Sequence, residues 1–352
     1  MVQPKLRNEE GRQGTFHGRA GTLFGIVIVN VLLTIVTVGV FHFWGKTRVR
    51  RFFCSHTEFD GDRFEYHGTG FELFVGALKG LCFFGLPVIA ALYYFREVAV
   101  LPVYLFAALL APFALHSARR YRMSRISWRG VRFSFRGPLG ACYAIMIPGV
   151  LLSALTLGLY FPYFRARMVR YWFQHTYFGR TPLGYDGVGK DLFQIYLAYW
   201  LRILGFIVGM IAIVAASALL ASIHPLLMIV MQIVLFASYL VALLSVLWWR
   251  AAEHRFHWGH TGILDARFYS DMTGGALFVL YLVHGLVAVL TLGFGFAWIL
   301  VDRFRFHLSR VTLYGQIDFE KVVHDLEQAD VEAVGEGVAD ALDIGDIGLG
   351  LG

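Results

Sequence analysis

Seven long apolar stretches constrain this chain more than any other feature. They run over residues 23–44, 73–95, 99–115, 139–164, 192–222, 225–249 and 276–301. Most of them exceed the ~20 residues that a helix needs to cross about 30 Å of hydrocarbon. Charged residues make up only 16% of the chain, against about 25% in typical soluble domains. The sequence therefore predicts an all-α polytopic membrane protein.

One segment of the chain recurs further along it. Residues 16–74 reappear without a gap at 135–193, at a constant offset of 119. The Thr-x-Gly motif at Thr37–Gly39 returns at Thr156–Gly158 and again at Thr291–Gly293. This pattern predicts two tandem repeats and a truncated third. The expected units are residues 1–118, 119–253 and 254–329, followed by a tail over 330–352.

Charge is distributed unevenly along the chain. Residues 1–317 hold 30 Lys and Arg against 14 Asp and Glu, a net charge of +16, whereas residues 318–352 have a net charge of −9. Basic loops beside apolar helices favour contact with the bilayer and its anionic headgroups, so we expect no nucleic-acid partner. The acidic tail over 330–352 has no aromatic residue, and we expect it to be disordered. The sequence identifies no protein partner.

The positions of Lys and Arg favour one topology. If all seven stretches crossed the membrane, the two sides would hold 13 and 16 of these residues. Such an even split is unusual, because loop Lys and Arg normally set orientation. If the stretches at 23–44, 139–164 and 276–301 instead enter and leave on one face, that face holds 28 and the other holds one. We therefore expect four full spans, three broken or re-entrant helices and cytoplasmic basic loops, with seven spans as the alternative.

Each of these three stretches contains a breaking point, the Thr-x-Gly motif. Glycine permits a sharp bend, and the threonine hydroxyl can bond a carbonyl group that the break frees. The alternative is that the small residues only let neighbouring helices pack closely. Two spans in each unit would make the repeats parallel, whereas three would make them inverted. Inverted repeats with broken helices are typical of transporters.

Short segments of alternating aromatic and β-branched residues lie between the apolar stretches. Examples are Phe64–Tyr66, Val131–Phe135 and Ile317–Phe319. These segments predict short β-strands at the membrane surface, which could pair into a small cytoplasmic sheet.

The order of motifs within the repeat resembles the bacterial inner-membrane family typified by YjgN. That order is Thr-x-Gly, aromatic residues, Arg-x-x-Arg, His-Thr, then Gly-x-Gly and a helix start of acid, Leu and Phe, and it covers roughly residues 16–320. The family pattern Thr-Leu-Gly-Ile-Tyr-x-Pro-Trp is incomplete here. The first copy keeps Trp44 without the proline, the second keeps Pro162 without the tryptophan, and the third has Asp302 in place of an arginine. The resemblance implies a multi-pass protein of the inner membrane and supplies no activity.

Paired arginines follow the first two broken stretches. Arg48 and Arg51, and their copies Arg167 and Arg170, are spaced i and i+3, which places each pair on one face of a helix. Two guanidinium groups in this arrangement could hold the phosphate of an anionic lipid or solute. The structural alternative is that arginine and aromatic residues anchor the helices at the interface.

Matched acids begin two of the expected spans. Glu72 and Asp191 lie in the first turn, where a carboxylate interacts favourably with the helix dipole, and a role at the helix start explains their position. Lys79 lies about two turns deeper than Glu72. It is a candidate for a buried cation in a pathway, unless its side chain snorkels towards the interface.

Polar residues inside the broken stretches complete the candidates for a pathway. Asn30 and His284 occupy equivalent positions in the first and third copies, and Thr34 lies one helical turn after Asn30. They could line a hydrated cavity or form hydrogen bonds between helices. The full set of pathway candidates is Asn30, Thr34, Thr37, Gly39, Lys79, Thr156, Gly158 and His284.

No residue pattern indicates a metal, a cofactor or a catalytic site. His254, His257 and His260 have a spacing that resembles metal ligands, yet the positions 135 residues earlier are all arginine. Arginine is a poor ligand, so these positions favour a positive charge or a hydrogen-bond donor over zinc. We expect no metal, no cofactor and no enzymatic activity.

The sequence leads to two functional hypotheses. The first is transport or channel-like permeation through a pathway formed by the broken helices. The alternative is a non-transporting scaffold whose basic face binds anionic lipid and whose acidic tail recruits a partner.

Overall fold

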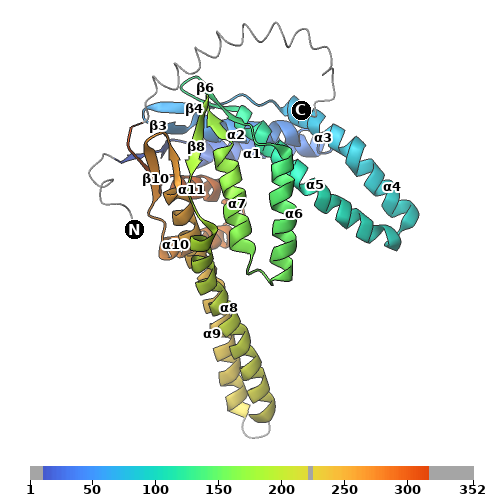
Figure 1. Cartoon of the computed structure of the whole chain (residues 1–352), viewed down its shortest axis with the longest axis vertical. Helices are drawn as coiled ribbons and strands as arrows, with labels where there is room; N and C mark the ends of the chain where they lie inside the picture. Colours follow the sequence, from blue (N-terminus) through green and yellow to red (C-terminus); the bar gives the residue numbers. More distant parts are fainter. Residues whose placement is uncertain (1–10, 221–224, 317–352) are drawn as a thin grey trace.

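Pairs of helices alternate with pairs of strands along the chain (Figure 1). The computed structural model describes residues 11–220 and 225–316. The helices are α1 (Ala20–Val36), α2 (His42–Ser55), α3 (Gly70–Gly80), the π-helical turn η2 (Leu81–Gly85), α4 (Leu86–Phe95), α5 (Glu97–Ser124), α6 (Leu139–Leu155), α7 (Phe161–Gln174), α8 (Gly189–Leu220), α9 (Pro225–Gly259), α10 (Gly274–Leu290) and α11 (Phe296–Ser309). The strands are β1 (Arg12–Gln13), β2 (Thr15–Phe16), β3 (Thr57–Phe59), β4 (Asp62–Tyr66), β5 (Ile126–Trp128), β6 (Val131–Phe135), β7 (Thr176–Phe178), β8 (Thr181–Tyr185), β9 (Thr261–Ile263), β10 (Ala266–Ser270) and β11 (Val311–Tyr314).

The strands form one antiparallel sheet that closes on itself. Its order is β1-β11-β10-β9-β8-β7-β6-β5-β4-β3-β2. Only Gly14 separates β1 from β2, so the two ends of this order are consecutive in the chain. Gln13 pairs with Thr312 of β11, and Phe16 pairs with Thr57 of β3. The segment before α1 therefore joins the two edges of the sheet into a β-barrel.

Short turns connect the strands of the barrel. The β3–β4 turn has φ values of 53° at Asp60 and 83° at Gly61, and the β5–β6 turn has 50° at Arg129 and 76° at Gly130. Two successive positive φ angles define a type I′ turn, whose twist matches that of the paired strands. The Asp60 carboxylate accepts hydrogen bonds from Arg12 at 3.0 Å and from Arg129 at 3.4 Å. These bonds tie the N-terminal strand to two neighbouring hairpins at the barrel rim.

The inside of the barrel holds a hydrophobic core, one of five such clusters in the described part of the chain. Every strand from β3 to β11 directs an apolar side chain inwards, as the two-residue period of a strand requires. The buried members are Trp128, Val131, Phe178, Ile263, Ala266 and Leu313, and Phe59, Phe64, Phe133, Leu183 and Phe268 pack against them.

This arrangement corrects the expected fold class. Most described residues are helical, as predicted, but the short strands do not form a small sheet on the surface of an all-α protein. They form a closed central barrel, because each strand adds one inward apolar residue to a shared core. The predicted strand at Ile317–Phe319 lies outside the described residues, as does the tail over 330–352. The boundaries of the repeat units stay a prediction.

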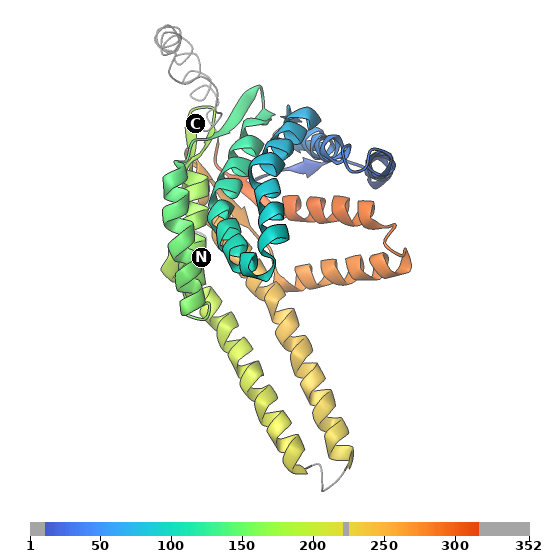
Figure 2. The ribbon, with the colours of Figure 1, turned by 90° about the vertical axis from the view of Figure 1, so that its right-hand side faces the viewer.

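Five helical hairpins surround the barrel in the described part of the chain (Figures 1 and 2). Four are α1–α2, α6–α7, α8–α9 and α10–α11, and in the fifth a continuous helix over Gly70–Phe95 pairs with α5. Neighbouring hairpins touch through α2 and α3, α5 and α6, α7 and α8, α9 and α10, and α11 and α1. The last contact buries Leu23 against Ala297 and Val301. The helices thus close a ring near the barrel, while the tips of the hairpins diverge (Figure 2).

In three of the hairpins the helix is interrupted at the Thr-x-Gly motif, as the sequence predicted. The middle residues Val38, Leu157 and Leu292 have φ angles of 51°, 50° and 49°, and the glycines that follow have 93°, 90° and 87°. Positive φ is uncommon for residues other than glycine and unusual for a β-branched valine. The motif therefore makes a tight left-handed turn between two antiparallel helices.

The threonine of the motif satisfies backbone groups on both sides of this turn. The Thr37 hydroxyl donates to the carbonyl oxygen of Leu33 at 2.7 Å and accepts from the backbone N–H of Phe41 at 2.9 Å. Thr156 and Thr291 make the equivalent pairs of bonds. One side chain therefore replaces hydrogen bonds that the interrupted helix has lost.

Four helices are long and apolar enough to cross a membrane among the residues described. They cover Gly70–Phe95, Glu97–Ser124, Gly189–Ser217 and Ile229–Gly259, where the sequence predicted four full spans. At 32 residues α8 is about 48 Å long, well above the ~30 Å of the hydrocarbon layer. The shorter apolar helices α1, α6 and α10 have 17 residues each.

The repeated His-Thr motif ends a helix and begins a strand. His56 Nδ1 lies 2.8 Å from the carbonyl oxygen of Phe52, and the Thr57 hydroxyl donates to that of Phe53 at 2.7 Å. The pairs His175–Thr176 and His260–Thr261 make the same contacts. Because the last carbonyls of a helix have no intrahelical partner, these side chains serve as C-terminal caps.

Glycine begins α3, α8 and α10, where each helix meets the one before the strands. These glycines are Gly70, Gly189 and Gly274, and they contact Trp44, Tyr163 and Trp248 respectively. A Cβ atom at Gly70 would lie 2.7 Å from the backbone Cα of Trp44. The second glycine of the Gly-x-Gly motif thus permits close approach of two helices.

We expect Gly70→Ala to destabilise the protein and Gly76→Ala, on the same helix, to leave it as stable or more stable. A Cβ at Gly76 meets nothing within 4 Å, and alanine is favoured over glycine in a helix by about 1 kcal/mol. Overpacking against the Trp44 backbone costs about 1–3 kcal/mol. Thermal unfolding of the two variants in detergent measures this difference, and equal midpoints would contradict the close contact.

Candidate functional site

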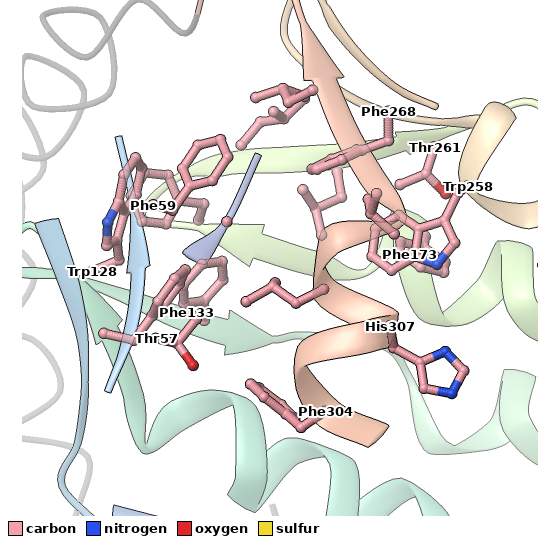
Figure 3. A pocket seen from close by; sticks show the side chains of 18 of the residues that line it. Thr57, Phe59, Trp128, Phe133, Phe173, Trp258, Thr261, Phe268, Phe304 and His307 are labelled. Atoms are coloured by element: carbon pink, nitrogen blue, oxygen red, sulfur yellow. The ribbon is translucent and has the colours of Figure 1, made fainter. Parts of the chain in front are cut away.

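A cavity of about 470 Å³ lies inside the barrel (Figure 3). Strands supply Phe59, Phe64, Trp128, Phe133, Phe178, Leu183, Ile263, Phe268 and Leu313 to its wall, and helix ends supply Phe173, Trp258, Phe304 and Leu308. Figure 3 places Phe59 and Trp128 on one side of the space, with Phe173 and Trp258 on the opposite side. The volume falls within the range of about 300–1,000 Å³ that is typical of small-molecule sites.

Trp128 is the centre of one side of this wall. Its ring centroid lies 5.5 Å from that of Phe59, 5.9 Å from that of Phe64 and 5.8 Å from that of Phe178. Aromatic pairs at these separations attract one another beyond the area that they bury. The indole N–H of Trp128 donates to the carbonyl oxygen of Asp62 at 3.2 Å, so its polar atom is satisfied. The wall is therefore rigid and apolar.

The polar side chain of His254 is already engaged at the cavity wall. Its Nδ1 lies 2.9 Å from Ser270 Oγ, and the indole N–H of Trp258 donates to its Nε2 at 3.1 Å. Because Nε2 accepts a hydrogen bond, the ring is neutral and carries its proton on Nδ1. His254 thus adds no charge to the cavity.

The remaining polar groups of the wall are neutral as well. The Thr57 and Thr261 hydroxyls donate to backbone carbonyls in their helix caps. The ring of His307 lies 5.8 Å from that of His254. Burial lowers the pKa of His307, and the nearby Arg303 lowers it further. Among the residues that the structure describes, no Asp, Glu, Lys or Arg lines the cavity.

A separate polar cluster joins α7, α9 and β8. Glu253 accepts a hydrogen bond from Arg165 Nε at 3.1 Å, and its carboxylate lies 3.4 Å from His257 Nε2. The Tyr185 hydroxyl lies 2.8 Å from His257 Nδ1, and burial raises the pKa of this phenol. The Arg165–Glu253 ion pair is partly exposed, and it links α7 to α9. None of these four residues lines the cavity.

The structure separates the predicted pathway residues. Thr37 and Gly39 lie at the tip of α1–α2, whereas Thr156 and Gly158 lie at the tip of α6–α7. These tips point in different directions from the barrel (Figures 1 and 2). Lys79 is an exposed residue in the last turn of α3. These positions do not share a cavity among the described residues.

Asn30 and Thr34 lie together in a groove on one face of α1–α2. Thr34 donates to the Asn30 carbonyl oxygen at 2.6 Å, and the buried Asn30 side chain donates to the Gly45 carbonyl oxygen at 3.2 Å. Asn30 also accepts from Arg48 at 3.5 Å. The hydrogen-bonding interpretation of Asn30 therefore holds: its side chain links the two helices of the first hairpin.

In the hairpin α10–α11, a contact of different charge stands at the position that the Asn30–Arg48 contact has in α1–α2. His284 Nε2 lies 2.9 Å from the Asp302 carboxylate, and the two residues are 18 positions apart, as Asn30 and Arg48 are. The second hairpin has Gly149 at this position, with no side chain, packed against Phe164. The three short hairpins thus share a fold and differ in the polar pair between their helices.

The four predicted anion contacts have unequal surroundings. Arg170 donates to the Gly187 carbonyl oxygen at 2.9 Å, and Arg167 lies 3.4 Å from the Tyr160 hydroxyl. Arg48 and Arg51 line a groove that does not include Asn30 in its wall. The first pair therefore shares one open space.

The predicted helix-start acids lie in the first turns of α3 and α8. Glu72 forms a capping box with Thr69 and also accepts from Tyr121 at 3.0 Å and Arg125 at 2.9 Å. Asp191 lies in the first turn of α8 and is exposed. The interpretation of Glu72 as a helix cap is confirmed, and its contacts with α5 add a role in packing.

The three histidines of α9 have separate partners. His254 contacts Ser270, His257 contacts Glu253 and Tyr185, and His260 contacts the Phe256 carbonyl oxygen. In the part of the chain that the structure describes, no three His, Cys, Asp or Glu side chains are grouped to hold a metal ion.

The aromatic cavity is a feature that the sequence did not predict. Its signal was present in the inward residues of the short strands, such as Phe59, Phe133 and Phe178. A strand of three residues contributes one or two inward side chains, so no single segment reveals a shared interior. Only the closure of the barrel brings these residues together.

Comparisons with known proteins agree with the resemblance read from the motifs. The chain matches a family model described as "Bacterial protein of unknown function (DUF898)" over residues 12–341. The inner membrane protein YjgN of Escherichia coli strain K12 is 30% identical over 146 residues, which cover 42% of this chain and 36% of that protein. YjgN of Salmonella typhimurium is 29% identical over 149 residues, or 41% of this chain and 37% of that protein.

The chain thus aligns with little more than a third of the length of these curated relatives. No solved structure matches it. The family match covers most of the chain, and the relatives are inner-membrane proteins by name. Together with four apolar helices of spanning length, these findings make it a multi-pass membrane protein of the DUF898 family, which includes the YjgN-like proteins of the bacterial inner membrane.

Proposed function

We propose that this protein binds an uncharged apolar molecule, such as the hydrocarbon chain of a lipid, inside its barrel. The observation that carries the proposal is the cavity of about 470 Å³, lined by strands and helices and walled by aromatic side chains. Binding sites for apolar ligands combine such walls with few polar groups. Here the polar groups of the wall already have partners or are neutral, so a charged ligand would lose its hydration without compensation.

A binding role fits the arrangement better than permeation along the Thr-x-Gly turns. A pathway lined by Thr37–Gly39 and Thr156–Gly158 requires these turns to approach one another, and their hairpins diverge. The scaffold hypothesis requires no such approach. Transport therefore remains a prediction without structural support, and binding in the barrel is the function that we favour.

We infer that three hairpins are re-entrant and that the two long hairpins provide four spans. The tips of the short hairpins are apolar and unusually exposed, at 92% for Val38, 83% for Leu157 and 87% for Leu292. Apolar tips of this kind favour hydrocarbon over water. The tip of one long hairpin, between α4 and α5, carries Arg96 and Glu97 beside exposed tyrosines. This composition is typical of a membrane interface.

The second helices of the short hairpins support the same topology. α2 has 14 residues and includes Lys46, Arg48, Arg50 and Arg51. A span requires about 20 mainly apolar residues, so α2 is too short and too basic to cross. Both ends of this hairpin join the barrel, which keeps its entrance and exit on one face. The excess of Lys and Arg on that face favours a cytoplasmic location for it.

We expect single cysteines at Arg96, Asp186 and Val38 to differ in accessibility, in a background without the three native cysteines. A membrane-impermeant thiol reagent should modify the Arg96 position in intact cells and the Asp186 position only after lysis. The Val38 position should react only after detergent is added, because its hairpin ends inside hydrocarbon. Modification of Val38→Cys in intact cells would show that the short hairpin crosses, and would favour seven spans.

We expect an alkyl diazirine probe to label the barrel interior saturably. The tested protein is the full chain in detergent, and peptide mass spectrometry locates the modified residues. Labelling of the strand peptides around Trp128 and Phe178 should fall when an unlabelled alkane competes. Labelling of the outer faces of α8 and α9 should not, because detergent contacts there are not saturable.

A variant that fills the cavity, with a matched control on an outer helix, completes this experiment. Leu183→Trp adds volume to the cavity wall, whereas Leu282→Trp makes the same change on α10 at a side chain that is 50% exposed. Saturable labelling should be lost in the first variant and kept in the second, with both proteins unfolding at similar temperatures. Saturable labelling that survives in a folded Leu183→Trp protein would exclude the cavity as the binding site.

A further inference from the structure

A groove that is separate from the barrel cavity and from the Asn30 groove runs along the first helical hairpin, α1–α2. It has a volume of about 530 Å³ and lies between α1 and α2. The polar part of its wall includes Thr22, Arg48, Arg51 and His56, and the apolar part includes Ile26 and Val29. A Cβ at Gly25 would meet nothing within 4 Å, so the α1 side of the groove is open. The groove is amphipathic, unlike the cavity in the barrel.

The copies of Arg51, which are Arg170 and Arg305, and a further arginine, Arg255, bind backbone carbonyls. Arg170 donates to Gly187 at 2.9 Å, and Arg255 donates to Met272, in each case 17 residues further along the chain. Arg305 lies 3.4 Å from the Gly18 carbonyl oxygen. Arg51 makes no such bond to Gly68, the residue 17 positions after it. Among the described residues, Arg51 alone of these four makes no hydrogen bond to a loop carbonyl, and it lines the groove.

The groove has a positive charge without a protein counter-ion. Arg48 stacks over the Phe41 ring at 5.1 Å and contacts the neutral Asn30 amide at 3.5 Å. Within the described residues, neither Arg48 nor Arg51 forms an ion pair with a carboxylate, and no carboxylate lines the groove. Two guanidinium groups on one helix face can bind phosphate oxygens through charge-assisted hydrogen bonds.

The position of the groove suits a lipid headgroup. Arg48 and Arg51 follow the Gly39 turn by 9 and 12 residues, or about 14–18 Å along the helix. If the apolar tip lies in hydrocarbon, these guanidinium groups reach the level of the phosphates at the cytoplasmic interface. The exposed Val29 side chain continues the groove towards the tip, where an acyl chain would run.

We propose that this groove binds an anionic phospholipid, with its phosphate between Arg48 and Arg51 and its acyl chain along Ile26 and Val29. The apolar wall favours a lipid over free phosphate. The absence of a carboxylate from the groove lining favours a headgroup without an amine, such as phosphatidylglycerol, over a zwitterionic one. This site is independent of the cavity in the barrel and of its ligand.

Photo-crosslinking of the full chain in mixed vesicles tests the proposal. The probe is phosphatidylglycerol with a diazirine in its acyl chain, and the readout is labelling of the α1 peptide. Arg48→Ala and Arg51→Ala should each reduce this labelling about fivefold or more, since hydrogen bonds to charged groups are the strong ones. Arg51→Lys should retain part of it, because a lysine keeps the charge without the fork of donors.

The matched control is Arg167→Ala, which removes the residue equivalent to Arg48 in the second hairpin and changes the net charge equally. It should leave labelling of α1 unchanged. Unlabelled phosphatidylglycerol should compete with the probe, whereas phosphatidylcholine and inorganic phosphate should not. Competition by phosphate alone would replace the lipid site with a phosphate site.

Unchanged labelling in both alanine variants, with melting temperatures equal to that of the parent protein, would overturn the proposal. An equal loss in Arg167→Ala would also overturn it, because it would show a general effect of charge. The barrel cavity does not enter these outcomes. Alkane labelling inside the barrel should be the same in Arg51→Ala and in the parent protein.

Discussion

The N-terminal segment pairs with β11 through β1 and with β3 through β2, and the rest of the structure depends on these two pairings. An open sheet of short strands would leave two edges of unpaired backbone groups. β1 and β2 remove both edges, because a break at Gly14 lets one segment pair on its two sides. The same segment places α1 beside α11 and closes the ring of helices. The same N-terminal segment therefore closes both the sheet and the ring of helices.

A closed barrel also restricts the helices. Each helical hairpin lies between two strands of the same barrel, so its first and last residues must return to the same place. Each hairpin therefore begins and ends at the barrel, whatever its length. In the topology that we propose, this return and the tight turn at Thr-x-Gly would together keep the basic loops on one face.

The helix breaks could be predicted from sequence because they depend on residues that are neighbours in the chain. The barrel could not be predicted, because it depends on contacts between residues that are far apart in the chain. Thr37 and Gly39 act within one turn of helix, so their effect depends on neighbours in the chain. Glu72 likewise caps the helix in which it lies. The barrel instead joins strands of two to five residues that are separated by whole hairpins. The cavity depends on that long-range pairing, so its aromatic residues looked like isolated strand positions.

The three short hairpins differ in chemistry despite their common fold. Their interhelical positions hold Asn30 with Arg48, Gly149 with Arg167, and His284 with Asp302. A purely structural repeat would need only packing at these positions, and Gly149 shows that packing suffices. The first hairpin adds a positive groove and the third places a carboxylate where that groove has its arginine. The lipid site that we propose would therefore be confined to the first of these three hairpins, where two arginines line one groove.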